Sequence, residues 1–329
     1  MLPSRRAALA ATASFVVLTA CSAGESTGAA PPVATAGAGF PVTLATKFGD
    51  VTITAAPRRV VALGWGDAET ALALGVQPVG ASDWVAFGGE GVGSWAAGRY
   101  DTAPEIIGTR EPSYEAIAAL APDLILDVKS SGDEDRYRTL SAIAPTLGVP
   151  EGGDSYLTTL EDQVSMIARA LGEEGAGQAL LAGVDTAFAE VAGGHPQWAG
   201  RTVTAAARSG KGWGAYIDGS SRLEFLEELG FVQNPQIAAL PVNGGGFSVD
   251  VSPENLTALA ADVIVLFPIS VTAGEITGDP VWQALSTVAD GRALVLDPDV
   301  ARAYALGSVL SLQHALDALV PLLEGLGDL

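Results

Sequence analysis

Short apolar runs alternate with short helical segments along most of the chain. The runs at 60–63, 78–82 and 124–126 consist of apolar and small residues, which is typical of strands buried in a sheet. Between them, 67–74 and 113–120 carry apolar residues at helical spacing. Alternation of strands with helices predicts an α/β fold built mostly on parallel sheets. A β-branched hairpin, 42–46 with 51–54, is expected to precede it.

Two longer helical stretches interrupt this alternation in the middle of the chain. Apolar residues keep a spacing of three and four over 157–171 and again over 173–192, and Gly172 separates the two stretches. At about 1.5 Å per residue, the second stretch is roughly 30 Å long. Such a helix predicts a rigid link between two lobes, and a last helix is expected over 307–323.

The chain repeats part of its own sequence. Segment 113–125 returns as 252–264, with Ser, Glu, Ala, Leu, Ala, Asp and Ile at matching positions, and 140–144 is echoed by 285–289. In both halves an upstream strand that follows an arginine leads to a Trp-Gly pair. One echo would be ordinary in an alanine-rich chain, but three in the same order predict two lobes of one design. We expect an N-terminal lobe over 42–156, connecting helices over 157–198, a C-terminal lobe over 199–305 and a C-terminal helix over 306–329.

The first forty residues have a different character. Two arginines precede the apolar run 7–18, and small residues lead up to Cys21, which together are typical of an export signal. The run is too short to span a bilayer comfortably. Leu18-Thr19-Ala20-Cys21 resembles a bacterial lipobox, in which the cysteine is acylated; a non-lipidated signal with a chance cysteine is the alternative. We expect a lipoprotein signal peptide over 1–20 and a flexible tether over 21–41.

Charge and composition exclude several classes of function. The 329 residues include 17 Lys and Arg against 38 Asp and Glu, a formal charge of −21, so a nucleic-acid partner is not expected. With one cysteine and two histidines, the chain forms neither an internal disulfide nor a Cys/His zinc site. His195 and His314 lie far apart in sequence and are interpreted as structural, so no metal site built from side chains is predicted.

Aromatic and basic residues follow several of the predicted strands. In a two-lobed α/β protein the ligand cleft lies where the carboxyl ends of the strands face each other. The alternatives are core packing for the aromatic residues and a solvated surface for the arginines. The candidate ligand-binding residues are Trp65, Trp84, Arg110, Lys129, Arg208, Trp213, Tyr216, Phe247 and Tyr304, with Phe267 at a further strand end.

An exported dinucleotide-binding enzyme is the weak catalytic alternative. Segment 64–69 half-matches the dinucleotide fingerprint, and Asp83 follows the next strand where a ribose-binding acid belongs. However, Glu69 replaces the last small residue of the fingerprint, and the bulky Trp65 would crowd a pyrophosphate. The sequence contains no Gly-x-Ser-x-Gly, no Walker-type loop and no His-Glu-x-x-His.

The chain resembles the iron-siderophore substrate-binding proteins of ABC importers. The resemblance rests on the lipobox, on the two linked lobes and most specifically on segments 58–69, 111–115 and 121–125. The resemblance covers the chain from about Val42 to its end. It implies two Rossmann-like lobes joined by one long helix, the helical-backbone periplasmic-binding fold. It implies no enzymatic activity, and a lipid-anchored monomer at the extracytoplasmic face of the cell membrane.

The same resemblance implies the ligand and the partner. A ferric siderophore is captured in the cleft and passed to an ABC permease; haem or cobalamin is the alternative ligand within the class. Glu115 and Glu254, which the internal repeat aligns, correspond to the acidic residues that dock each lobe onto the permease. They would also be favourable charges at helix N-termini. Iron would arrive inside its chelator, so the protein itself needs no metal ligand and no cofactor.

Overall fold

The computed structural model describes residues 39–326. The predicted signal peptide, nearly all of the predicted tether and Cys21 lie outside the described residues. Every described residue belongs to a single unit by its contacts, and the two lobes are subdivisions of that unit. No helix in the described range is both long and apolar enough to cross a membrane.

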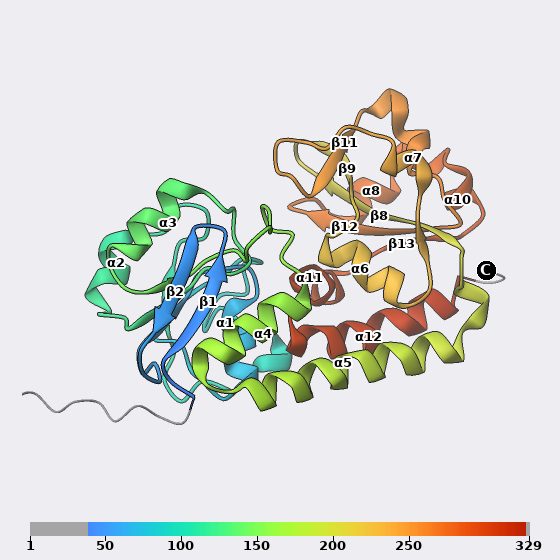
Figure 1. The fold of residues 1–329 in the computed structure, drawn as a ribbon. Coiled ribbons are helices and arrows are strands. Elements are labelled where there is room, and N and C mark those ends of the chain that lie inside the picture. Colours follow the sequence, from blue (N-terminus) through green and yellow to red (C-terminus); the bar gives the residue numbers. More distant parts are fainter. Residues whose placement is uncertain (1–38, 327–329) are drawn as a thin grey trace, which may run out of the picture. The chain divides into compact units, whose positions relative to one another are not determined.

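A hairpin and a parallel sheet form the N-terminal lobe (Figure 1). The hairpin pairs β1 (Val42–Thr46) with β2 (Gly49–Ile53), as predicted. The sheet has the order β5-β4-β3-β6-β7, with all pairs parallel. Its strands are β3 (Val60–Ala62), β4 (Gly80–Ser82), β5 (Glu105–Ile107), β6 (Leu124–Leu126) and β7 (Thr146–Leu147). The intervening helices are α1 (Asp67–Ala73), η1 (Ser94–Ala96), α2 (Tyr114–Ala119) and α3 (Glu134–Ser141).

The C-terminal sheet is mixed. Its order is β11-β9-β8-β12-β13, with β10 paired to the start of β8. Strand β9 is antiparallel to β8 because only residues 210–211 connect them, which is too short for a crossover. The strands are β8 (Thr202–Ser209), β9 (Gly212–Tyr216), β10 (Val232–Gln233), β11 (Ser248–Val251), β12 (Val263–Ile269) and β13 (Ala293–Val295). The helices are α6 (Ser221–Glu228), α7 (Pro235–Ala238), η3 (Pro253–Leu259), α8 (Ala273–Thr277), α9 (Pro280–Gln283), α10 (Ser286–Ala289) and α11 (Pro298–Leu306).

The internal repeat of the sequence is visible in the two sheets. In each lobe the repeated segment forms a short helix, α2 or η3, and the strand that follows it. That strand, β6 or β12, lies between the first strand of its sheet, β3 or β8, and the shorter β7 or β13. The remaining strands also correspond by place, with β9 and β11 where the N-terminal sheet has β4 and β5, but β9 runs antiparallel to both of its neighbours whereas β4 is parallel to both of its own.

Of the two predicted connecting helices, one belongs to the N-terminal lobe. Helix α4 (Leu160–Leu171) buries Met166 and Ile167 against the N-terminal sheet, in the same core cluster as β3 and β6. Helix α5 (Glu174–Gly194) is the link, and it leads through η2 (Pro196–Trp198) into the C-terminal lobe. Helix α12 (Val309–Glu324) runs beside α5, with Phe188 of α5 in one core cluster with Leu312 and Leu316 (Figure 1).

Both sheets are buried on both faces. Successive residues of a strand point to opposite faces, so Val60 and Ala62 pack under α4 while Val61 packs toward α2 and α3. In the C-terminal lobe Val263 and Val265 of β12 belong to one core cluster and its alternate residues to another. This explains why these strands are continuously apolar, without the alternation of a half-exposed sheet.

Candidate binding cleft

A cleft of about 750 Å³ is lined by residues of both lobes. Its lining residues follow β3, β4, β5 and β6 in the N-terminal lobe, and β9, β12 and β13 in the C-terminal lobe. For the parallel strands these are the carboxyl ends, where the backbone turns away and side chains can project toward a ligand. Strand β9 is antiparallel, and its last residue, Tyr216, lines the cleft. Its volume is within the range of sites that enclose a small molecule.

Six of the predicted residues line this cleft: Trp65, Trp84, Arg110, Lys129, Tyr216 and Phe247. They come from segments up to about 180 residues apart in sequence, and the strand ends bring them together. Phe267 in β12 also lines the cleft. Whether each of these residues contacts a ligand remains a prediction.

The other three predicted residues, Arg208, Trp213 and Tyr304, lie outside the cleft lining. Trp213 is buried in the core of the C-terminal lobe, with its ring 5.5 Å from Trp282. Strand β9 alternates, so Tyr216 points to the opposite face from Trp213. The guanidinium carbon of Arg208 lies over the Trp213 ring, 5.1 Å from its centre. Tyr304 is 1% exposed and donates its hydroxyl to the carbonyl of Arg222 at 2.6 Å.

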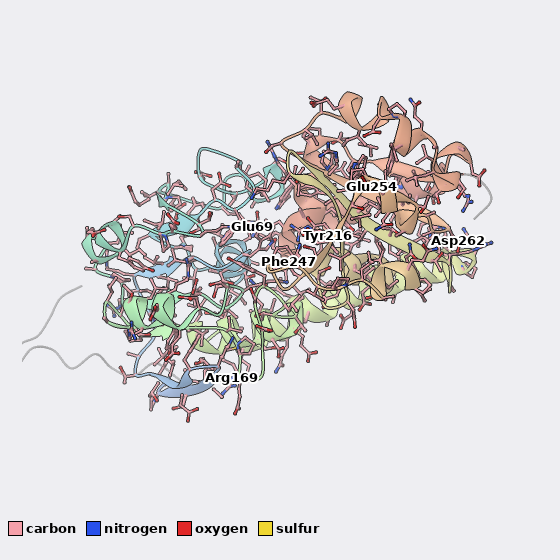
Figure 2. The ribbon with its side chains drawn as sticks, turned by 90° about the horizontal axis from the view of Figure 1, so that it is seen from above. Glu69, Arg169, Tyr216, Phe247, Glu254 and Asp262 are labelled. Atoms are coloured by element: carbon pink, nitrogen blue, oxygen red, sulfur yellow. The ribbon has the colours of Figure 1, made fainter. Side chains whose placement is uncertain are left out.

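Aromatic rings form a continuous path from one lobe to the other. Ring centroids are 5.4 Å apart for Trp65 and Trp84, 5.6 Å for Trp84 and Tyr156, and 5.7 Å for Tyr156 and Phe247. Tyr216 stacks beyond Phe247 at 6.4 Å, and Figure 2 labels these last two residues. The path offers flat apolar surface to a bulky ligand.

The two cleft indoles have their polar edges occupied. Trp65 donates its Nε1 proton to the carbonyl of Leu306 at 2.9 Å, and Trp84 donates to the carbonyl of Leu63 at 2.9 Å. Because each N–H is already bonded, the ring faces carry the remaining interaction capacity. The first of these bonds also ties the N-terminal lobe to the end of α11.

Four basic side chains line the cleft, two from each lobe: Arg110, Lys129, Arg222 and Arg302. We call them the cleft cations. No aspartate or glutamate is among the described lining residues, although acids outnumber bases by 38 to 17 in the chain. Their charges therefore give the cleft a positive potential within an acidic protein.

Two of the cleft cations are buried, and we call them the buried pair. Lys129 is 3% exposed and Arg222 is 8% exposed. Burial lowers the pKa of Lys129 to about 8, and the neighbouring charge of Arg222 acts in the same direction, against Glu224 and Asp67. Neither side chain donates a hydrogen bond to another described residue, and Arg222 Nε is a buried atom without a partner in that range.

Arg222 is held by aromatic rings instead of a carboxylate. Its guanidinium carbon lies 4.5 Å from the ring centre of Tyr216, 4.9 Å from Trp65 and 5.6 Å from Phe267. Cation–π attraction of this kind fixes the side chain without using its N–H groups. We call this arrangement the Arg222 cage.

Three further lining residues, Arg222, Tyr156 and Arg302, were not among the candidates predicted from the sequence. Arg222 stands in the first turn of α6, shortly after β9 ends at Tyr216, so a prediction of β9 as a strand would have placed Arg222 among the residues that follow strand ends. Tyr156 lies in the segment that leaves β7, and Arg302 lies within α11, where no strand end marks them. Only the tertiary arrangement brings these two to the cleft.

Unusual backbone angles gather at the cleft. Four non-glycine residues of the described chain have φ in the left-handed region, and three of them line the cleft: Ala86 (56°), Tyr156 (56°) and Ser270 (55°). Such conformations are costly for residues with a Cβ and cluster at functional sites.

A buried polar network supports Trp65 from below. Gln163 of α4 donates its side-chain amide to the Trp65 carbonyl at 2.8 Å and to Asp67 Oδ1 at 2.6 Å, while Asp67 Oδ2 accepts from the Val128 amide at 2.8 Å. Asp67 is fully buried, and burial raises its pKa to about 6 against the opposing hydrogen bonds. The network joins the ends of β3 and β6, which carry Trp65 and Lys129.

This network also explains the half-match to a dinucleotide fingerprint. A Cβ at Gly64 would collide with the Asp67 carboxylate, so the glycine makes room for an acid of the protein itself. Helix α1 begins after Gly66 with no side-chain cap. Glu69 is 2% exposed and accepts hydrogen bonds from Trp95 Nε1 and from the Ser308 hydroxyl. Buried carboxylates here disfavour a pyrophosphate.

The repeat-aligned glutamates and the two histidines lie outside the cleft lining. Glu115 in the first turn of α2 and Glu254 in η3 are exposed, and Figure 2 labels Glu254. His195 Nε2 lies 2.8 Å from Glu324 Oε1, and His314 Nε2 lies 2.9 Å from Asp299 Oδ2. Within residues 39–326 no group of three or more His, Cys, Asp or Glu side chains is placed to hold a metal ion.

The fold and the cleft define a two-lobed α/β binding protein. Residues 60–300 match the family of periplasmic binding proteins, and the chain belongs to this family. The class that the sequence predicted is thus confirmed.

Similar proteins are known from bacteria. The probable siderophore-binding lipoprotein YfiY of Bacillus subtilis (strain 168) is 28% identical over 292 residues, which cover 80% of this chain and 82% of that protein. The Fe(3+)-citrate-binding protein YfmC of the same organism is 26% identical over 266 residues, or 76% of each chain. The crystal structure of a periplasmic solute binding protein from Mycobacterium smegmatis str. MC2 155 has a TM-score of 0.75 at 29% identity, covering 87% of this chain and 99% of that one.

Proposed function

We propose that this protein captures a ferric siderophore outside the cytoplasm and delivers it to the permease of an ABC importer. The observation that carries the proposal is the cleft, in which a path of aromatic rings is combined with four basic side chains and no described carboxylate. Ferric siderophores are bulky and rich in oxygen. Flat rings supply contact area for such a ligand, and guanidinium groups match its oxygen atoms.

Relatives and family support the same function. The family is one of binding proteins, and two relatives carry iron or siderophore binding in their names. We assign the protein no catalytic role. Within the proposal, Cys21 is the lipidated residue that holds the mature protein at the extracytoplasmic face of the membrane. The protein acts as a monomer.

Intrinsic fluorescence tests ligand capture directly. Titration with ferric siderophores is expected to give saturable quenching, because Trp65 and Trp84 line the cleft. Haem, cobalamin and NAD complete the panel. Trp84→Phe is expected to reduce the quenched fraction, whereas Trp198→Phe, a change of a tryptophan 1% exposed in the C-terminal core, should leave it intact. Saturable quenching by haem or cobalamin but by no ferric siderophore would identify haem or cobalamin as the ligand. No response to any compound would refute the proposal.

Delivery to the permease is assigned to Glu115 and Glu254. Charge reversal at both positions, Glu115→Lys with Glu254→Lys, is expected to abolish iron uptake by cells while the isolated protein still binds ligand. The matched control is Glu161→Lys with Glu190→Lys, the same change of charge at two exposed positions on α4 and α5. Loss of ligand binding in the first variant, or equal loss of uptake in the control, would contradict the docking assignment.

A further inference from the structure

We infer that the cleft selects a ferric chelate with several negative charges, built on hydroxycarboxylate or catecholate groups, over a neutral hydroxamate chelate. Lys129 and Arg222 are the counter-charges of this ligand. The inference rests on the proposed function and narrows its ligand class.

The first argument is the burial of unpaired charge. A buried cation is normally paired with a carboxylate, because removing a charge from water is costly. Lys129 and Arg222 are both more than nine-tenths buried, yet neither donates a side-chain hydrogen bond to a described residue. Glu224 and Asp67 act on Lys129 through space, but neither lines the cleft. A bound anion would supply an acceptor to the buried Nε of Arg222 and a counter-charge to both cations.

The second argument is the division of charge between the lobes. Arg110 and Lys129 stand on the N-terminal lobe, and Arg222 and Arg302 stand on the C-terminal lobe. Each lobe thus contributes one cation of the buried pair and one more accessible cation, which we call the outer pair. Like charges on facing walls repel, and only a ligand with several negative charges relieves the repulsion on both sides. A neutral chelate would leave the repulsion between the cations of the two lobes unrelieved.

The third argument is the Arg222 cage. Rings from both lobes hold the guanidinium, since Trp65 belongs to the N-terminal lobe and Tyr216 and Phe267 to the C-terminal lobe. The cage fixes the side chain and leaves its N–H groups unused. A pre-positioned guanidinium with free donors fits the paired oxygens of a carboxylate or a catecholate.

The test compares iron chelates that differ in charge. Binding of ferric citrate, a ferric tris-catecholate and the neutral hydroxamate chelate ferrichrome is measured by tryptophan quenching and calorimetry, at low and high salt. We expect at least one anionic chelate to bind ten or more times more tightly than ferrichrome, with an affinity that falls as salt rises. The tighter of the two anions identifies the carboxylate or the catecholate source.

Variants assign the selectivity to residues. Lys129→Met and Arg222→Gln are each expected to weaken the anionic chelate at least tenfold and ferrichrome less than threefold. Arg169→Gln, at an exposed position of α4 labelled in Figure 2, removes the same charge as the control. If a buried-pair variant does not fold, the double variant Arg110→Gln with Arg302→Gln is used in its place. Its affinity for the anionic chelate is expected to fall threefold or more, while its affinity for ferrichrome stays the same.

The outcomes separate this inference from the proposed function. Ferrichrome binding as tightly as the anionic chelates would overturn the inference and leave siderophore capture standing. Unchanged anion affinity in the buried-pair and outer-pair variants would also overturn it. Failure of every iron chelate to bind would refute both.

Discussion

Arg136 and Arg222 are buried to nearly the same extent, at 7% and 8% exposure, and each lies near the start of a helix. Their surroundings differ. Arg136 donates to both oxygens of Asp127, at 2.7 Å and 3.0 Å, and to the carbonyl of Thr109 at 3.0 Å. Arg222 is surrounded by aromatic rings and has no hydrogen-bonded acceptor among the described residues.

The comparison shows that burial alone does not separate structure from function. Arg136 is satisfied within the protein, and its bond to Thr109 holds the loop that carries Arg110 at the cleft. The guanidinium of Arg222 keeps N–H donors that no described residue accepts, and a bound ligand would supply the acceptors. Whether a buried charged side chain has hydrogen-bond partners within the protein, more than how deeply it is buried, indicates whether it binds a ligand. The following predictions test this distinction.

Arg136→Met is expected to lower the free energy of unfolding by about 3–5 kcal/mol, because it leaves Asp127 buried without its partner. Urea denaturation measures the loss. Arg138→Met is the matched control on the same helix. Its side chain is 74% exposed and its ion pair with Asp135 is at the surface, so a change below about 1 kcal/mol is expected. If Arg136→Met lowered the free energy of unfolding no more than the control does, Arg136 would not be the structural residue that the comparison with Arg222 requires.

Arg222→Met is expected to keep the free energy of unfolding of the ligand-free protein within about 1 kcal/mol of the parent. It removes cation–π attraction but also an unpaired buried charge, and the two effects oppose each other. The same urea experiment decides. A destabilisation equal to that of Arg136→Met would mean that Arg222 is a structural residue like its counterpart.

Lys129 differs from both arginines because its charge titrates near neutral pH. Burial lowers its pKa to about 8, and a bound anion would favour the charged form and raise that pKa. Binding then takes up a proton above pH 8, so affinity for an anionic chelate falls as pH rises.

The expected loss between pH 7 and pH 9 is severalfold, measured by calorimetry with a tris-catecholate chelate. The other charged groups that act on Lys129 are Glu224, Arg222 and Asp67. Asp67 titrates below this window, with a pKa of about 6. Lys129→Met should abolish the dependence, and a variant that kept it would assign the titration elsewhere.

Arg208→Gln is expected to have the smallest effect, a change in chelate affinity of less than about twofold. The side chain stacks on Trp213 outside the cleft lining, and its Nη1 donates to the carbonyl of Ser209. A tenfold loss of chelate affinity in the same titration would mean that the binding surface includes the β8–β9 hairpin. It would also contradict the view that Arg222, and not Arg208, is the ligand-binding arginine of this lobe.

Much of the architecture was predictable from the chain alone. Continuous apolar runs and helical spacing located β3, β4, β6, α2 and α5 within a few residues. The repeat identified α2 and η3 as equivalent elements. The mixed C-terminal sheet was not foreseen, because strand direction depends on the short turn between β8 and β9 as well as on the strands themselves.

The site was predictable in part, for a specific physical reason. Residues that directly follow a strand, such as Trp65 and Lys129, reach the cleft because strand ends share one edge of a sheet. Trp213 follows no such rule, since the alternation of β9 sends its ring into the core. Sequence proximity to a strand end says nothing about which face a side chain takes.

The sequence by itself determined the class of fold, the duplicated design and the scarcity of cysteine and histidine, because these depend on local period, composition and order along the chain. Only the tertiary structure decided which charges are paired. Arg136 and Arg222 look alike in sequence, each near a helix start in an acidic chain. Their partners lie on other elements, so the distinction between a satisfied and an unsatisfied cation exists only after the lobes have folded.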